Sequence, residues 1–288
     1  MNEKNSNDDA VSAFFKLIQS QDLEQKKVWY STAAEAYNQA RPNYPQQLIN
    51  RVLELTQISS HAKILEIGCG PGIATKDFAP FGFSMVCVEP NPEFCQFARE
   101  NCVAYPNVEI INTSFEEWEL ESEKFDAVLA ASSIHWVSEE VRYQKVAEAL
   151  KESGFLILLW NVVTQPQYEI YQKFKNIYQI HAPSLAEFEE QRTQKEYSEG
   201  VDYGIINLGK KIIDSGKFKE LIYEITSHEI TYKTNDYLTL LSSLSSYIAL
   251  DSQTKDNLFE NLRTAIDIEF GGNITCSYHS AFQIVRKV

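Results

Sequence analysis

The chain has 288 residues, of which 44% are apolar and 12% aromatic, enough to bury the core of one large α/β domain or of two small domains. Its formal net charge of −14 argues against nucleic acid as a partner, because phosphate binding depends on Lys and Arg. No apolar run approaches the roughly 18 residues of a membrane span, and the five cysteines include no C-x-x-C pair. With a polar, acidic N-terminus, these features predict a cytoplasmic protein with reduced thiols and no stable membrane association.

The first 28 residues are expected to form a tail and one helix outside the main domain, which takes residues 29–288. Residues 1–10 are polar and predicted to be disordered. Apolar residues at helical spacing predict an amphipathic helix over 10–25. The next segment, 29–45, carries two prolines and four aromatic residues around Arg41. We predict that it forms little helix and makes the lip of a pocket.

The stretch around three alternating glycines predicts a nucleotide-type binding turn. An apolar run of strand length ends at Gly68, Gly70 and Gly72, and a second apolar run ends on Glu89. Glycines let a ligand lie against the backbone, and an acid at the next strand tip can accept hydrogen bonds from ribose hydroxyls. Glu66 precedes the turn, where its charge would repel a diphosphate and suit a cationic ligand. The two carboxylates are therefore expected to face one cleft.

Strands and helices alternate through the first half of the main domain, which predicts a parallel α/β sheet. Expected strands are 63–67, 83–89, 108–112, 125–130 and 155–160, and expected helices are 46–57, 72–80, 92–102 and 139–152. Residues 165–216 break this alternation with aromatic residues near one helical face. A long strand over 218–232, helices over 234–249 and 252–269, and a last strand over 274–286 complete the prediction.

The stretch from Glu66 to Gly72 resembles motif I of the class I S-adenosylmethionine (SAM) methyltransferases, E/D-x-G-x-G-x-G. The pattern Y-x-x-A-R-P-x-Y-P over 37–45, the pair His135-Trp136 and the segment 237–247 resemble a subgroup that includes trans-aconitate methyltransferases and related type 11 domains. The resemblance implies a Rossmann-like, seven-stranded, mostly parallel sheet with an antiparallel last strand. It also implies a helical cap over the substrate, formed by residues 165–216.

The resemblance further implies SAM as the cofactor and S-adenosylhomocysteine as its product, with a cofactor site spread over several loops. The residues expected there are Glu66 near the ammonium group, Gly68, Gly70 and Gly72 along the methionyl and ribose parts, Glu89 with Pro90 at the ribose, Ser114 and Phe115 at the adenine, and Ala130 and Ser132 beside the sulfonium. An equally compatible role for Ser114 is that of a helix N-cap with Glu117 as its capping-box partner.

On the acceptor side, the candidates are Tyr37, Arg41, His135, Trp136, Trp160 and Asn161. Arg41 could pair with a carboxylate, and His135 could act as a general base for a hydroxyl or an amine. Solvated arginine and packed histidine remain the plainer interpretations. No Cys/His cluster has metal-ligand spacing, so no metal site is predicted.

The predicted function is therefore methyl transfer from SAM to a small-molecule acceptor, with a carboxylate as the candidate acceptor group, by a monomer or homodimer. Three alternatives remain open at this stage: a SAM-dependent cyclopropane-forming or other lipid alkyl-transfer enzyme, an NAD-dependent dehydrogenase, and a non-catalytic SAM-binding protein.

Overall fold

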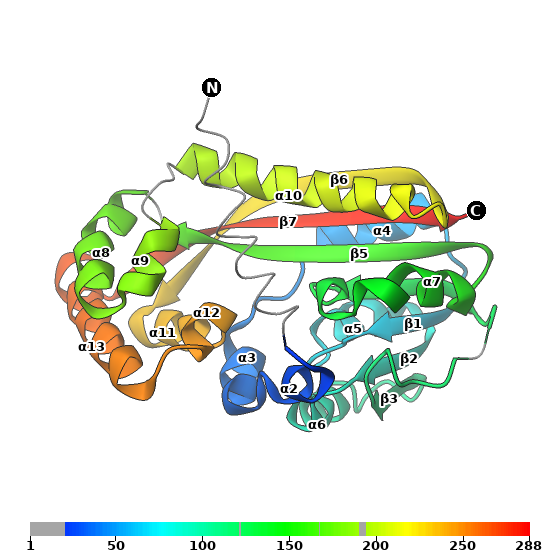
Figure 1. The fold of residues 1–288 in the computed structure, drawn as a ribbon, viewed down its shortest axis with the longest axis horizontal. Helices are drawn as coiled ribbons and strands as arrows, with labels where there is room; N and C mark the ends of the chain where they lie inside the picture. The colour runs from blue at the N-terminus through cyan, green and yellow to red at the C-terminus, as the bar shows by residue number, and fades with distance from the viewer. Residues whose placement is uncertain (1–20, 121, 167, 190–193) are drawn as a thin grey trace.

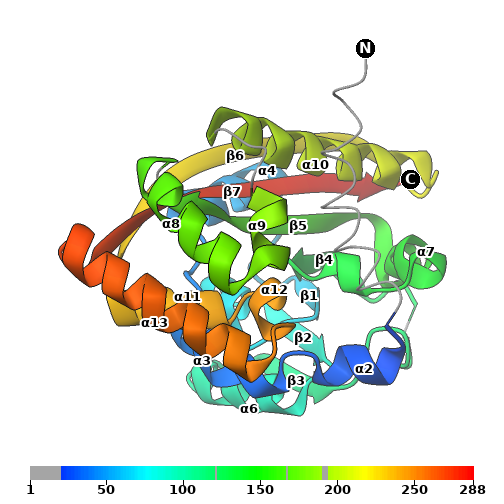
Figure 2. The ribbon, with the colours of Figure 1, turned by 60° about the vertical axis from the view of Figure 1, so that its left-hand side comes forward.

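The structure, a computed structural model, describes residues 21–120, 122–166, 168–189 and 194–288 (Figures 1 and 2). Its centre is a seven-stranded sheet of order β3-β2-β1-β4-β5-β7-β6. The strands are β1 (Lys63–Ile67), β2 (Ser84–Glu89), β3 (Val108–Asn112), β4 (Phe125–Ala131), β5 (Leu150–Pro166), β6 (Phe218–Lys233) and β7 (Asn273–Lys287). Strands β1 to β5 pair in parallel, and β7 pairs antiparallel with both β5 and β6. This confirms the predicted fold class.

Helices cover both faces of the sheet, because the central strands are apolar on both sides. One face packs against α4 (Gln46–Thr56), α5 (Ile73–Phe78) and α6 (Pro92–Asn101), with Ile64, Met85 and Leu129 in its core. The other face packs against α7 (Glu139–Ala149) and α10 (Gln194–Asp214). The result is a three-layer α/β domain.

The long strands β5, β7 and β6 carry a second group of helices at one end (Figure 2). These helices are α8 (Tyr168–His181), α9 (Pro183–Glu189), α11 (Thr234–Ser242), α12 (Ser245–Ile248) and α13 (Ser252–Glu269). They share an apolar core in which Phe174, Leu240 and Tyr278 are fully buried. Tyrosine hydroxyls in this core pair with each other, Tyr178 with Tyr247 at 2.7 Å and Tyr232 with Tyr278 at 2.7 Å. These pairs satisfy polar atoms that would be costly to bury alone.

The N-terminal predictions need correction. Residues 1–20 lie outside the described residues, and the expected helix over 10–25 does not continue through 21–22. Asp22 is the N-cap of a separate helix, α2 (Leu23–Val28), and accepts the backbone N–H of Gln25. The expected lip over 29–45 is largely helical, with a turn at Ser31–Ala33 and α3 (Ala34–Ala40). Its alanines favour the helix, and both prolines follow its end.

Later elements also differ from the predictions, and the strand expected over 155–160 runs from Leu150 to Pro166 as β5. The helix expected over 139–152 ends at Ala149, where β5 begins. The helix expected over 234–249 is interrupted at Ser243 and Leu244, between α11 and α12. Helix α10 crosses the sheet face instead of joining the expected cap. Among the described residues, no helix has the length and apolar character needed to cross a membrane.

Candidate active site

A cavity lies at the carboxyl ends of the parallel strands, where ligands bind in open α/β sheets. Its walls come from the segments that follow β1, β2, β3 and β4, and from the N-terminal segment. Among the residues that line it are Lys27, Tyr30, Tyr37, Arg41, Tyr44, Gly68, Gly70, Glu89, Pro90, Asn91, Phe94, Ser114, Phe115, Ala131, Ser132, Trp136 and Asn161. Most of the predicted site residues thus meet at one place.

The glycine turn after β1 has a backbone that other residues adopt only with strain. Gly68, Gly70 and Gly72 have φ values of 63°, 55° and 85°. A Cβ atom added to Gly68 would lie 2.8 Å from the Cβ of Ser133, whereas one added to Gly70 would meet no atom within 4 Å. Gly70 therefore leaves its backbone open to the cavity, while Gly68 is required by packing. Gly72 does not line the cavity and begins α5.

Glu89, at the tip of β2, lies in the cavity wall with both carboxylate oxygens engaged. Oε2 accepts the backbone N–H of Gly70 at 2.9 Å, and Oε1 accepts that of Asn91 at 2.8 Å. Each oxygen keeps lone-pair capacity for another donor. Burial raises the pKa of Glu89 to about 7. The two Glu89 carboxylate oxygens are therefore held in fixed orientations at the cavity, and burial keeps water from fully solvating them.

The expectation that Glu66 and Glu89 face a common cleft is wrong for Glu66. Side chains alternate along β1, so Glu66 points to the face covered by α5 and does not line the cavity. Its Oε2 accepts the Thr75 hydroxyl at 2.7 Å and the Cys87 thiol at 3.6 Å. Oε1 has no hydrogen-bond partner, and burial raises the pKa of Glu66 to about 8. Any effect on a ligand must pass through the glycine turn or through its electric field.

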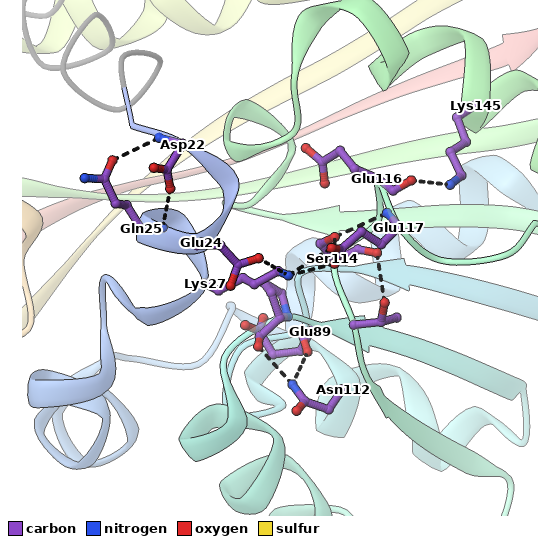
Figure 3. A network of polar contacts seen from close by, with 12 residues as sticks. Asp22, Glu24, Gln25, Lys27, Glu89, Asn112, Ser114, Glu116, Glu117 and Lys145 are labelled. Carbon is purple, nitrogen blue, oxygen red and sulfur yellow. Dashed lines mark hydrogen bonds and ion pairs between the residues drawn. The ribbon is translucent and has the colours of Figure 1, made fainter.

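The loop after β3 forms one end of the cavity wall. Figure 3 shows its Ser114 beside Glu117 and Lys27. Ser114 and Phe115 both line the cavity and are almost fully buried. The Ser114 hydroxyl donates to Glu117 Oε2 at 2.8 Å and accepts the Glu117 N–H at 3.2 Å. These contacts close a turn over residues 115–117, and no helix follows it, so Ser114 does not act as the expected helix N-cap. Lys27 of α2 forms an ion pair with Glu117 at 2.9 Å and closes this end.

On the N-terminal side, aromatic rings and Arg41 form the wall. Tyr30 contacts Tyr37, Phe94 and Trp136, with ring centroids 5.4, 5.6 and 5.7 Å apart. The Arg41 guanidinium lies over the Tyr37 ring at 4.7 Å and donates two hydrogen bonds to Ser243. Tyr37, Arg41 and Trp136 therefore gather at the cavity as predicted from the sequence.

A polar group lies beside them, formed by residues just after β4 and within β5. The Tyr44 hydroxyl lies 3.2 Å from the Ser132 hydroxyl, and the Asn161 N–H donates to the same Ser132 oxygen at 3.4 Å. Ser132 has a φ of 53°, an uncommon value that turns the chain at the cavity. Ala130 is fully buried and does not line the cavity; its neighbour Ala131 does.

His135 and Trp160 are the acceptor-side candidates that the structure leaves off the cavity wall. The His135 ring packs between Trp136 and Trp160, with centroids 5.8 and 6.0 Å away. Burial and the nearby Arg142 charge lower the pKa of His135 to about 4. The position and neutral state at pH 7 favour the packed interpretation of His135 over a general base.

Several cavity residues were not singled out from the sequence. Lys27 lies in the N-terminal segment expected outside the main domain, and Phe94 has no local signal of binding. Tyr44 belongs to the pattern over 37–45 but had no individual role assigned to it. Asn91 could have been found, because Asn before Pro is an N-cap signature directly after the Glu89 strand tip. It caps α6 through the Phe94 N–H at 2.9 Å and donates to the Lys27 carbonyl at 3.0 Å.

The fold resembles solved methyltransferase structures. A putative type II methyltransferase from Anaeromyxobacter dehalogenans aligns with a TM-score of 0.58 and 16% identity, over 85% of this chain and 97% of the other. A putative methyltransferase from Anabaena variabilis gives 0.52 and 17%, over 85% and 98%. Residues 64–154 match the methyltransferase domain family. The chain thus carries a methyltransferase domain over residues 64–154.

Curated methyltransferases match part of this chain. An uncharacterized methyltransferase of Mycobacterium tuberculosis is 32% identical over 132 residues, 46% of this chain and 51% of the relative. A probable S-adenosylmethionine-dependent methyltransferase of Saccharomyces cerevisiae is 26% identical over 146 residues, 49% of each. The chain therefore spans about half the length of these relatives.

Proposed function

We propose that the chain transfers the methyl group of SAM to a small-molecule acceptor that carries a carboxylate. The observation that carries the cofactor half is Glu89 in the cavity wall, bonded to Gly70 beside an open glycine turn. An oriented carboxylate suits the two ribose hydroxyls. Because burial raises the pKa of Glu66 to about 8, its carboxyl group is mostly neutral at pH 7 and adds little negative charge for a cation. The described residues thus fit SAM.

The proposed cofactor contacts run along the cavity. Gly68 and Gly70 pass backbone beside the methionyl and ribose parts, and Glu89 with Pro90 holds the ribose. Ser114 and Phe115 hold the adenine, and Ala131 with Ser132 lies beside the sulfonium. All of these residues line the cavity.

Bound SAM supplies a methyl group that is already activated by its sulfonium. The residues of the chain then orient the acceptor and exclude water, which are the main contributions that an in-line displacement needs. Arg41 would hold an acceptor carboxylate as a fork, with the aromatic wall around it. An ionised carboxylate needs no general base, in agreement with the position of His135 away from the cavity.

The acceptor class rests on Arg41 and on the resemblance of residues 37–45, 135–136 and 237–247 to trans-aconitate methyltransferases. A different acceptor has some support, since a rat thiol S-methyltransferase is 25% identical over 125 residues. The experiment has two stages. Calorimetric titration with SAM, S-adenosylhomocysteine and NAD tests the cofactor, and binding of NAD without SAM would refute it. Mass spectrometry then follows methyl gain on panels of carboxylic acids and thiols, and methylation of thiols alone would refute the carboxylate.

A further inference from the structure

The junction between α11 and α12 reaches the cavity wall from the far end of the chain. It lies in the segment 237–247, for which the proposed function names no contact with the cofactor or the acceptor. Ser243 is the C-cap of α11 and is fully buried, and Leu244 takes an extended conformation before α12 starts at Ser245. Neither serine lines the cavity. Both touch residues that do.

Ser243 holds Arg41 by two hydrogen bonds. Arg41 Nε donates to the Ser243 hydroxyl at 2.9 Å, and Nη2 donates to the Ser243 carbonyl at 2.9 Å. The hydroxyl proton is directed away, to the Leu240 carbonyl at 2.6 Å. A cation at the last carbonyls of a helix is favoured by the helix dipole. Two of the five guanidinium N–H groups are thus committed, and up to three remain for a ligand.

Ser245 holds the neighbouring aromatic residue. The Tyr30 hydroxyl lies 2.6 Å from the Ser245 hydroxyl, and the Tyr30 ring packs edge-on against Tyr37. Tyr37 in turn carries the Arg41 guanidinium on its face. Helix α3, between Tyr30 and Arg41, packs against α11. The two serines therefore fix both ends of the N-terminal wall.

We propose that Ser243 and Ser245 are positioning residues that orient Arg41 and Tyr30 for acceptor binding. An arginine held at Nε and Nη2 presents its remaining edge in one direction, so less side-chain entropy is lost when a carboxylate binds. The helices at the end of the long strands thereby act on acceptor affinity without touching the acceptor. This inference rests on the proposed function for the acceptor, but the orientation of Arg41 can be measured without it.

The test compares S243A with S243T, which keeps the hydroxyl, and with S242A as a matched control. Ser242 makes a comparable bond, from its hydroxyl to the Thr239 carbonyl at 2.8 Å, and lies beside Ser243. The first readout is solvent exchange of the Arg41 Nε–H in the arginine-labelled full chain, measured by NMR. The second is the affinity for SAM by calorimetry, and the third is KM and kcat with trans-aconitate and a panel of small carboxylic acids.

For S243A we expect faster Nε–H exchange, a KM for the acid raised by about tenfold, and a SAM affinity within about twofold of the unmodified chain. S243T and S242A should behave like the unmodified chain. In the R41A background, adding S243A should cause no further change in the KM for the acid. Unchanged exchange in S243A, or equal losses of SAM and acid binding, would overturn the proposal.

If S243A does not fold, S245A replaces it, and an unchanged KM together with unchanged Tyr30 packing overturns the proposal. If the unmodified chain binds SAM but methylates no acid, the acceptor class is wrong. The positioning of Arg41 is then tested by comparing the exchange rate of its Nε–H in S243A with that in S242A, and faster exchange in S243A supports the positioning. Absence of SAM binding refutes the proposed function itself, independently of that comparison.

Discussion

The carboxylate of Glu89 accepts the backbone N–H of Gly70 across 2.9 Å, which ties the tip of β2 to the glycine turn after β1. The same carboxylate accepts the N–H of Asn91, the residue that caps α6. One side chain therefore fixes two loops and also faces the cavity. We therefore expect the Glu89 carboxylate to contribute both to the stability of the glycine turn and to the affinity for the ligand.

Replacing Glu89 with Gln should weaken SAM binding by about tenfold to a hundredfold. The amide NH2 of Gln would point at one of the two backbone N–H groups, so at least one bond becomes a donor–donor contact. Calorimetry of SAM binding measures the effect. E109Q on the exposed part of β3 is the control and should bind SAM normally. Equal affinities for E89Q and E109Q would show that Glu89 does not contact the ligand.

Alanine at Gly68 and at Gly70 should have different consequences. The two positions share positive φ values, which cost about 1 kcal/mol for alanine. G68A also places its Cβ against Ser133, so we expect a loss of about 2–3 kcal/mol in the free energy of unfolding. G70A has open space and should lose only the backbone cost, while its methyl group occupies the cavity and lowers SAM affinity. Urea unfolding measures the stability of each variant, and calorimetry measures its SAM affinity. Equal stabilities of G68A and G70A would contradict the contact assigned between position 68 and Ser133.

The ligand-free protein should become less stable as the pH rises from 5 to 8. Burial raises the pKa of Glu66 to about 8 and that of Glu89 to about 7, both above the ordinary value of 4.5. The folded state therefore binds more protons than the unfolded state in this window, so stability is greatest at its acidic end. E66Q should reduce the decline by about 1 kcal/mol per pH unit. Urea unfolding across this range measures it, with E109Q as the control; an unchanged slope in E66Q would count against the buried state of Glu66.

Removing the Lys27 ammonium should loosen the N-terminal segment more than it changes global stability. Lys27 pairs with Glu24 at 2.7 Å and with Glu117 at 2.9 Å, in an exposed network that salt can screen (Figure 3). For K27M we expect faster proteolytic cleavage within the segment 21–31, a nearly unchanged melting temperature and weaker SAM binding. K76M, on α5, is the comparison because Lys76 does not line the cavity. Identical proteolysis of the two variants would contradict the closing role of Lys27.

Local residue patterns were sufficient to predict most of the strands and helices of the α/β sheet. The apolar runs, the glycine spacing and the helix signals predict β1 to β4 and α13 with boundaries close to those observed, because strand and helix periodicities act over a few residues. The positions of Gly70, Glu89, Ser114 and Ser132 at one cavity follow from the same logic. Parallel strands bring their carboxyl ends to one edge, so residues just after each strand must meet there.

Packing between distant segments decided the rest. Which carboxylate faces the cavity depends on the strand face that α5 covers, and this turned Glu66 away from Glu89. The wall around Arg41 depends on Ser243, 202 residues further along the chain. The sequence by itself determined the α/β framework and the glycine turn, since these follow from local backbone preferences and strand order. Only the tertiary structure decided how the N-terminal segment and the α11–α12 junction complete the cavity, because side-chain fit between helices has no local signature.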